Sequence, residues 1–149
     1  MRAVIQRVKK ASVTVSEKQI AKIGKGLLVF LGIGAQDTRY DLNYLVSKTV
    51  NLRAFQDEND KMNLSPSDIE AEVLVVSQFT LFGDCRKGRR PSFTSAAAPE
   101  KAQGFYNDFI REVQKEGIRV SCGAFQKMMD ISLINDGPVT FLLDSKKLF

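Results

Sequence analysis

The first third of the chain alternates between strand-like and helix-like patterns of apolar residues. In residues 2–9, apolar and polar side chains alternate, which predicts a strand with two distinct faces. Val13 and Val15 predict a second short strand, which the glycine-marked turn at 24–26 follows. The continuous apolar run at 27–33 is typical of a strand buried on both faces.

Two segments show the 3.6-residue spacing of amphipathic helices. Residues 38–51 form the first, with Asp37-Thr38 offering the N-cap. The second begins at Pro99, which suits a first helical turn, and Gly117 favours its end. Its apolar face consists of Ala102, Phe105, Tyr106, Phe109 and Val113.

The rest of the chain alternates strands with polar loops. Residues 73–76 predict a buried strand, and 129–134 and 139–143 predict two more. The polar segment 57–66 and the long basic segment 83–98 are typical of loops. This order predicts a single α/β domain over residues 1–149, with a mixed or mainly antiparallel sheet and two main helices.

The composition indicates the class of protein and its cellular compartment. Of the 149 residues, 44% are hydrophobic and 26% charged, which is typical of an ordinary globular protein. No apolar run reaches the roughly 18–20 residues of a membrane span, and the N-terminus does not resemble a signal peptide. Cys85 and Cys122 form no CxxC pair, so we expect reduced thiols that act as small packing residues in the cytoplasm.

The positive charge of the chain is concentrated in one segment. The net charge is only +5, but Arg86, Lys87, Arg89 and Arg90 fall within five residues. Such a run suits the phosphates of a nucleic acid. The alternative is a solvated loop with no ligand.

Histidine is absent from the sequence, which excludes a Ser-His-Asp or Cys-His mechanism within the chain. The candidate catalytic segment is Ser77-Gln78-Phe79-Thr80, directly after a buried strand that would hold it rigidly. Ser77 and Thr80 offer hydroxyls, and the Gln78 amide and nearby backbone N–H groups could donate to an oxyanion. A nucleophilic Thr80 would need a base that the spacing does not supply, and a strand end that caps its own backbone is the alternative.

The segment Asn135-Asp136-Gly137-Pro138 joins the last two predicted strands. Asp-Gly between apolar runs indicates a hairpin turn. Pro138 complicates that interpretation because proline donates no ladder hydrogen bond, and X–Pro is the common place for a cis peptide. A cis bond would hold two backbone carbonyls in a fixed direction.

Together these segments resemble the D-aminoacyl-tRNA deacylase family, also called D-tyrosyl-tRNA deacylases. The resemblance runs from end to end of the chain and rests on the order and spacing of several short motifs. They are Arg2-Ala3-Val4-Ile5-Gln6-Arg7-Val8, Ala11-Ser12-Val13, Leu52-Arg53, Lys61-Met62-Asn63, Ser77-Gln78-Phe79-Thr80-Leu81, Lys87-Gly88, Arg90-Pro91-Ser92-Phe93 and Asn135-Asp136-Gly137-Pro138-Val139-Thr140.

The resemblance implies the family's barrel-like fold and an ester hydrolase that needs no metal and no cofactor. Its substrates would be D-aminoacyl-tRNA and glycyl-tRNA mischarged on tRNA(Ala), with the terminal ribose 2′-OH assisting the attack. The resemblance also implies a homodimer with no membrane partner, in which the cis Gly137–Pro138 segment of one subunit enters the other's site.

Residue roles follow from the same resemblance. Gly137 and Pro138 would be a chiral filter whose carbonyls leave room for an α-hydrogen but exclude an L side chain. Ser77, Gln78, Phe79 and Thr80 would frame the scissile carbonyl, with Gln78 and nearby N–H groups as oxyanion donors and Thr80 as a positioning group. Arg7 would brace the Gly-Pro segment from behind; a surface strand charge is the alternative.

One segment departs from the family pattern. Where the family usually shows Phe-Gly-Ala-x-Met, this chain reads Phe125-Gln126-Lys127-Met128-Met129. Phe125 and Met129 would still line the pocket for the terminal adenosine, and Lys127 could add a phosphate contact. Two other functions stay open: a non-catalytic RNA-binding module that uses Arg86 to Arg90, and an amidohydrolase that depends on Thr80.

Overall fold

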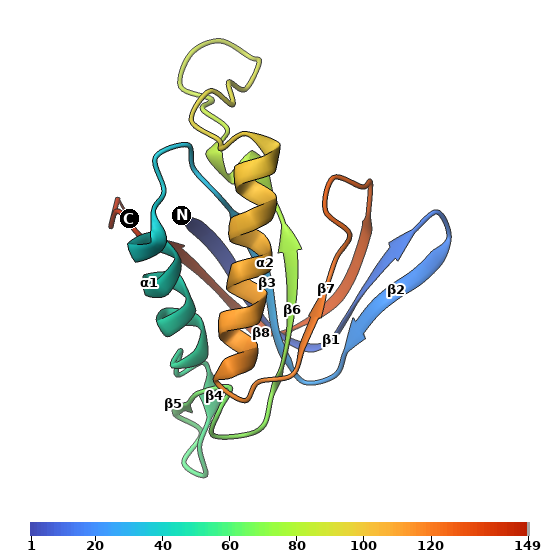
Figure 1. Cartoon of the computed structure of the whole chain (residues 1–149). Coiled ribbons are helices and arrows are strands. Elements are labelled where there is room, and N and C mark those ends of the chain that lie inside the picture. The colour runs from blue at the N-terminus through green and yellow to red at the C-terminus, as the bar shows by residue number, and fades with distance from the viewer. Residues whose placement is uncertain (149) are drawn as a thin grey trace.

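One mixed sheet and two helices make up the computed structural model, which describes residues 1–148 (Figure 1). The strand order is β2-β1-β3-β6-β7, and β8 pairs with the other edge of β1. β1 is antiparallel to its neighbours, whereas β6 is parallel to both β3 and β7. The predicted α/β class with a mixed sheet and two main helices is therefore confirmed, and the sheet curls into a nearly closed, barrel-like form.

The elements along the chain are the following. The sheet strands are β1 (Arg2–Val15), β2 (Lys18–Ile23), β3 (Gly26–Gly32), β6 (Glu72–Ser77), β7 (Val120–Cys122) and β8 (Asp130–Asp144). The helices are α1 (Arg39–Val50), α2 (Pro99–Lys115) and the short 3-10 turn η1 (Phe79–Phe82). A separate hairpin consists of β4 (Phe55–Gln56) and β5 (Met62–Leu64).

β1 is the axis of the sheet. On one side its first half pairs with β3 and its second half with β2, and on the other side β8 runs along nearly its whole length. The prediction of two separate strands at 2–9 and 13–15 was wrong, because β1 continues unbroken between them. Register shifts in its pairing with β8 lie between Gln6 and Lys10 and let the strand bend without ending.

β8 corrects the predicted chain reversal at 135–138. Residues on both sides of this segment pair with β1 in the same antiparallel direction, with Ile134 opposite Lys10 and Thr140 opposite Gln6. The segment is therefore not a hairpin. It is a bulge in one long strand: Asn135 pairs with Val8, whereas residues 136–139, opposite Arg7, have no pairing partner in β1.

Two apolar cores lie on the two faces of the sheet. The larger core lies between the sheet and the helices, with Ile5, Leu31, Leu45 and Phe109 fully buried within it. The smaller core lies in the curl formed by β1, β2 and β8, where Val13, Leu28 and Val76 meet. Because β3 and β6 contribute to both cores, they are buried on both faces, as the apolar runs predicted.

The helix ends agree with the sequence, but three local predictions fail. Thr38 caps α1, with its N–H and hydroxyl donating to Asp41 at 2.8 and 2.9 Å, and α2 begins at Pro99. The β4–β5 hairpin overlaps the predicted loop at 57–66, and β2 and β7 were not foreseen. Cys85 and Cys122 are both free and exposed, so the prediction that they are packing residues was wrong. No helix among residues 1–148 is long and apolar enough to cross a membrane.

Candidate active site

The Ser77–Thr80 segment begins where the buried strand β6 ends. The Gln78 N–H donates to the Leu31 carbonyl at 2.8 Å, which extends the β3–β6 pairing by one residue. The chain then turns into η1, whose first N–H groups, those of Phe79 and Thr80, have no partner within the turn. The Gln78 backbone N–H therefore already has a hydrogen-bond acceptor, whereas the N–H groups of Phe79 and Thr80 have none within the turn.

The side chains of this segment contact one another. The Gln78 amide Nε2 donates to Thr80 Oγ1 at 2.5 Å. Thr80 is exposed, and among residues 1–148 no base contacts its hydroxyl. An oxygen that accepts from an amide is a weaker nucleophile, because the donor withdraws electron density from it. This geometry favours a positioning role for Thr80 over nucleophilic attack.

Arg2 holds η1 from the N-terminal strand. Its Nη1 donates to the Leu81 carbonyl at 2.8 Å, its Nε pairs with Asp144 at 2.9 Å, and its guanidinium lies 4.7 Å from the Phe82 ring centre. These contacts join β1, the end of β8 and the turn. No local sequence pattern indicates this role for Arg2, because Leu81 lies 79 positions away along the chain.

The segment 123–129 lies beside the end of β6. Gly123 N–H donates to the Val75 carbonyl at 2.9 Å, and the Tyr106 hydroxyl donates to the same carbonyl at 2.8 Å. Burial raises the pKa of Tyr106, so this phenol remains a donor. Phe125 packs against Tyr106 with ring centres 5.8 Å apart, and Met129 packs on the smaller core that includes Val76. Both predicted pocket residues thus lie next to the strand that ends at Ser77.

The Gly137–Pro138 peptide is cis and exposed. Asn135 closes the bulge that contains it: its Oδ1 accepts from Val139 N–H at 2.8 Å and its Nδ2 donates to the Val139 carbonyl at 3.1 Å. A Cβ on residue 137 would lie 2.0 Å from the Val139 nitrogen, so only glycine fits this conformation. The role of Asn135 was missed, although asparagine in turn-rich sequence commonly bonds to the nearby backbone.

Arg7 contacts the bulge from inside the protein. It is 6% exposed, and its Nε donates to the Asp136 carbonyl at 2.8 Å and lies 3.3 Å from the Asp136 carboxylate. Its Nη1 donates to the Ala54 carbonyl at 2.6 Å. The alternative of a surface strand charge is excluded by this burial.

The bulge and the η1 turn lie at opposite ends of the sheet within one chain. Ser77 pairs with Leu31, which pairs with Ala3 near the start of β1, whereas the bulge lies opposite Arg7. The offset along β1 is about 13 Å at about 3.3 Å per residue, and three strand spacings of about 4.8 Å separate β8 from β6. In Figure 1, β6 points toward the long loop, and β4 and β5 lie at the other end of the sheet.

The basic loop, residues 83–98, projects from the protein next to η1, at the end of the sheet to which β6 points (Figure 1). Its base is closed by two backbone hydrogen bonds between Asp84 and Ser92, and Phe93 packs edge-on against Phe79 with ring centres 5.0 Å apart. Arg86 is paired with Asp84 at 2.7 Å, and its hydrogen bonds hold the pKa of that carboxyl well below its usual range. Lys87, Arg89 and Arg90 are exposed and have no ion pair or hydrogen bond among residues 1–148, so their charges remain available.

No group of three or more Cys, Asp or Glu side chains suited to a metal ion occurs within residues 1–148. The candidate site consists of the hydroxyls, the amide and the backbone groups of Ser77–Thr80. The fold defines a small barrel-like α/β protein in which this strand-end turn and a basic loop lie side by side (Figure 1).

Comparison with known proteins identifies the family. The sequence profile described as D-Tyr-tRNA(Tyr) deacylase matches residues 4–144. The chain is 58% identical to the D-aminoacyl-tRNA deacylase of Syntrophobacter fumaroxidans and 60% identical to that of Halothermothrix orenii, in both cases over 100% of each chain. The chain belongs to the D-Tyr-tRNA(Tyr) deacylase family.

Solved structures share the fold. A structure of the c-Myc DNA unwinding element binding protein superposes with a TM-score of 0.91 at 44% identity, covering 97% of this chain and 98% of that one. A probable eukaryotic D-amino acid tRNA deacylase superposes with a TM-score of 0.83 at 19% identity, covering 95% and 97%. The second likeness concerns the fold alone.

Proposed function

We propose that this chain hydrolyses the ester between a D-amino acid and the terminal adenosine of tRNA. We propose that it also hydrolyses the same ester in glycyl-tRNA mischarged on tRNA(Ala). Water adds to the carbonyl carbon, the bond to the ribose oxygen breaks, and that oxygen leaves with a proton. The products are the free amino acid and tRNA. Family membership and the histidine-free turn at the end of β6 support this proposal.

In this proposal the η1 turn binds the ester. The N–H groups of Phe79 and Thr80 and the second amide proton of Gln78 are the oxyanion donors, since the Gln78 backbone N–H already bonds to Leu31. Ser77 and Thr80 orient the carbonyl, and the ribose 2′-OH of the substrate assists the water. Phe125 and Met129 line the adenosine pocket. The unpaired side chains of Lys87, Arg89 and Arg90 contact tRNA phosphates, whereas Arg86 is neutralised by its ion pair with Asp84.

The Gly137–Pro138 segment is the chiral filter, and it acts on the partner of a homodimer. The single observation that carries this step is the separation of the bulge from η1 within one chain. An exposed segment that is braced from behind by Arg7 and closed by Asn135 is rigid enough to exclude an L side chain by contact. The chain works in the cytoplasm without a metal or a cofactor.

The test is a comparison of D-Tyr-tRNA and L-Tyr-tRNA. We expect the chain to release D-tyrosine rapidly and to leave L-Tyr-tRNA at the rate measured without protein. If both esters decay at the protein-free rate while tRNA still binds, the chain is a nucleic-acid-binding module, as the name of one structural neighbour, the c-Myc DNA unwinding element binding protein, would suggest. Amide cleavage that is lost with Thr80→Ala would favour the amidohydrolase.

A further inference from the structure

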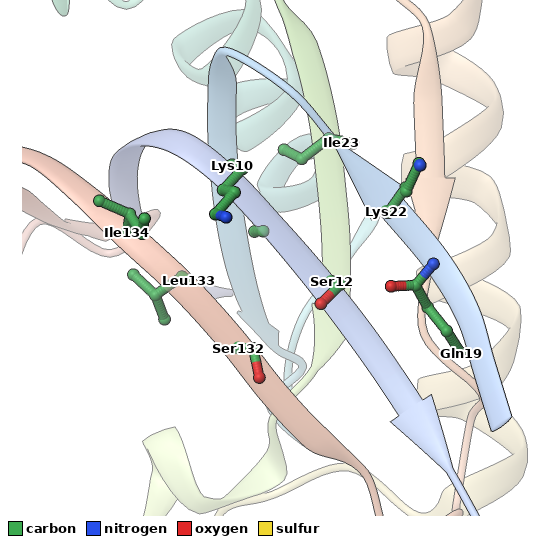
Figure 2. Close-up of a pocket in the computed structure, with 9 residues that line it drawn as sticks. Lys10, Ser12, Gln19, Lys22, Ile23, Ser132, Leu133 and Ile134 are labelled. Carbon is green, nitrogen blue, oxygen red and sulfur yellow. The ribbon is translucent and has the colours of Figure 1, made fainter. Parts of the chain in front are cut away.

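A hollow of about 320 Å³ lies on the outside of the curled part of the sheet, away from both helices (Figure 2). Three adjacent strands line it. Lys10 and Ser12 come from β1, Gln19 and Lys22 from β2, and Ser132 and Ile134 from β8. Ser12 lies between Lys22 and Ser132 in the sheet register, so these side chains share one rung.

The two ammonium groups of this hollow are donors without a protein acceptor. Lys10 and Lys22 are exposed, and the ammonium group of neither makes an ion pair, hydrogen bond or ring contact within the described part of the chain. No carboxylate lines the hollow. Two ammonium groups beside two hydroxyls and an amide therefore suit an anionic oxygen ligand such as a phosphate.

The exposure of these groups favours a polyanion over a small anion. At an exposed site, water and salt compete with a single phosphate, and the gain from one ion pair is small. A nucleic-acid backbone instead releases counterions at each contact, so that two lysines add to contacts made elsewhere. The complementary occupant is thus the backbone of an RNA that is already bound to the protein.

The position of the hollow indicates which RNA that is. Ile134 lies opposite Lys10, and Asn135, the next residue of β8, closes the Gly137–Pro138 bulge. Three residues of strand span about 10 Å, which is close to the screening length of about 8 Å at physiological salt. If the bulge enters the partner's site, Lys10 approaches the tRNA held there.

We propose that Lys10 and Lys22 form a second phosphate-contacting surface, which holds the backbone of the tRNA whose 3′ end lies in the partner's site. This inference rests on the proposed function. Each tRNA is then contacted by two chains: by the basic loop of the chain that supplies η1, and by the lysines of the chain that supplies the filter.

The test uses the full-length K10Q/K22Q variant with D-Tyr-tRNA and with D-tyrosyl-adenosine, which lacks the backbone. For tRNA we expect KM to rise about fivefold to tenfold at low salt and the slope of log KM against log salt to fall by roughly 1.4–1.8. We expect kcat for tRNA, and both constants for D-tyrosyl-adenosine, to stay at the wild-type values. K10R/K22R should restore the slope because it keeps both charges.

The matched control is K48Q/K115Q, which removes the same charge from the helices on the other side of the sheet. A salt slope for K10Q/K22Q equal to that of this control would overturn the inference. Binding of uncharged tRNA by the wild type and by K10Q/K22Q separates this result from failure of the proposed function. An unchanged binding slope there refutes the lysine surface even if no ester is cleaved, and a reduced slope supports it.

Discussion

Arg7 donates a hydrogen bond of 2.8 Å from its Nε to the carbonyl of Asp136, the residue directly before the cis Gly137–Pro138 peptide. The same guanidinium donates to Ala54 at 2.6 Å. One buried cation thus fixes the bulge of β8 to the segment that follows α1. The proposed filter is therefore held in place by Arg7, a buried residue that lies behind the exposed Gly137–Pro138 segment.

Replacing Arg7 by Ala should weaken both the fold and the selection of D-esters. The buried carbonyl of Ala54 and the part-buried carbonyl of Asp136 would lose charge-assisted bonds, and we expect a loss of about 2–3 kcal/mol in the free energy of unfolding. The bulge would also gain freedom, so the ratio of D-Tyr-tRNA to L-Tyr-tRNA hydrolysis should fall. Denaturant unfolding and the two deacylation rates measure these effects. A destabilised Arg7→Ala enzyme with unchanged D/L ratio would refute the bracing role.

Substitutions in η1 should separate backbone donors from the threonine hydroxyl. Thr80→Ala should keep substantial activity, because no base activates its hydroxyl. Phe79→Pro removes one proposed oxyanion N–H and should lower kcat by about 10²–10³, whereas Phe79→Leu keeps that N–H as the control. Single-turnover rates with D-Tyr-tRNA measure the effect. Complete loss of activity in a folded Thr80→Ala variant would revive the nucleophile hypothesis.

The arginines of the basic loop should contribute unequally to RNA binding. Arg86 is already paired with Asp84, so Arg86→Gln should change the salt dependence of tRNA binding little. Arg89→Gln with Arg90→Gln should reduce the slope of log Kd against log salt by roughly 1.4–1.8, because both charges are free. Titrations at several salt concentrations test the difference. Equal effects of Arg86 and of either single arginine would mean that the Asp84 pair opens in the complex.

Much of the site was accessible from the sequence because its parts are local. The end of a buried apolar run placed Ser77–Thr80 correctly at a strand end, and Pro99 and Gly117 gave the limits of α2. The Asp-Gly pair in 135–138 pointed instead to a hairpin, which the structure excludes. Both halves of β8 pair with the same strand, β1, in the same direction. This pairing joins residues that are distant in the sequence, so no local pattern indicates it.

The contacts that fix the site are also long-range. Arg2 reaches Leu81, and Arg7 reaches Ala54 and Asp136, with no periodicity that could connect them. The edge strand β2, with the sequence KQIAKI, has too few apolar residues to predict a strand. It is ordered because β1 offers it a ladder partner, so tertiary pairing overrides a weak local preference.

Acid should destabilise the protein through Asp41. Burial alone would raise the pKa of Asp41, but hydrogen bonds from Lys146, Ser145 and Thr38 outweigh it and hold that pKa below its ordinary value. A carboxyl with a lowered pKa in the folded state contributes stability above its unfolded pKa of about 3.9, and this contribution is lost as the pH falls below that value. Thermal unfolding should therefore show Tm falling below about pH 4, and less steeply in Asp41→Asn. Parallel pH profiles of the two proteins would contradict this assignment.

The division of labour between two chains can be measured directly in a mixed dimer. One chain carries Phe79→Pro, which disables its turn, and the other carries Gly137→Ala, whose Cβ would lie 2.0 Å from the Val139 nitrogen and displace its filter. The Phe79→Pro dimer should deacylate D-Tyr-tRNA at least about tenfold more slowly than the wild type. The Gly137→Ala dimer should lose selectivity and hydrolyse L-Tyr-tRNA as well, because its displaced filter no longer excludes an L side chain.

Differently tagged chains, co-expressed and purified through both tags, give the mixed dimer, and deacylation of D-Tyr-tRNA and of L-Tyr-tRNA per dimer is the measurement. If the filter acts on the partner, the intact turn of one chain meets the intact Gly137–Pro138 of the other. One of the two sites is then complete, and we predict about half of the wild-type D-Tyr-tRNA activity, with L-Tyr-tRNA left at the protein-free rate. Hydrolysis of L-Tyr-tRNA at about half the rate of the Gly137→Ala dimer would mean that turn and filter act within one chain, which contradicts the account.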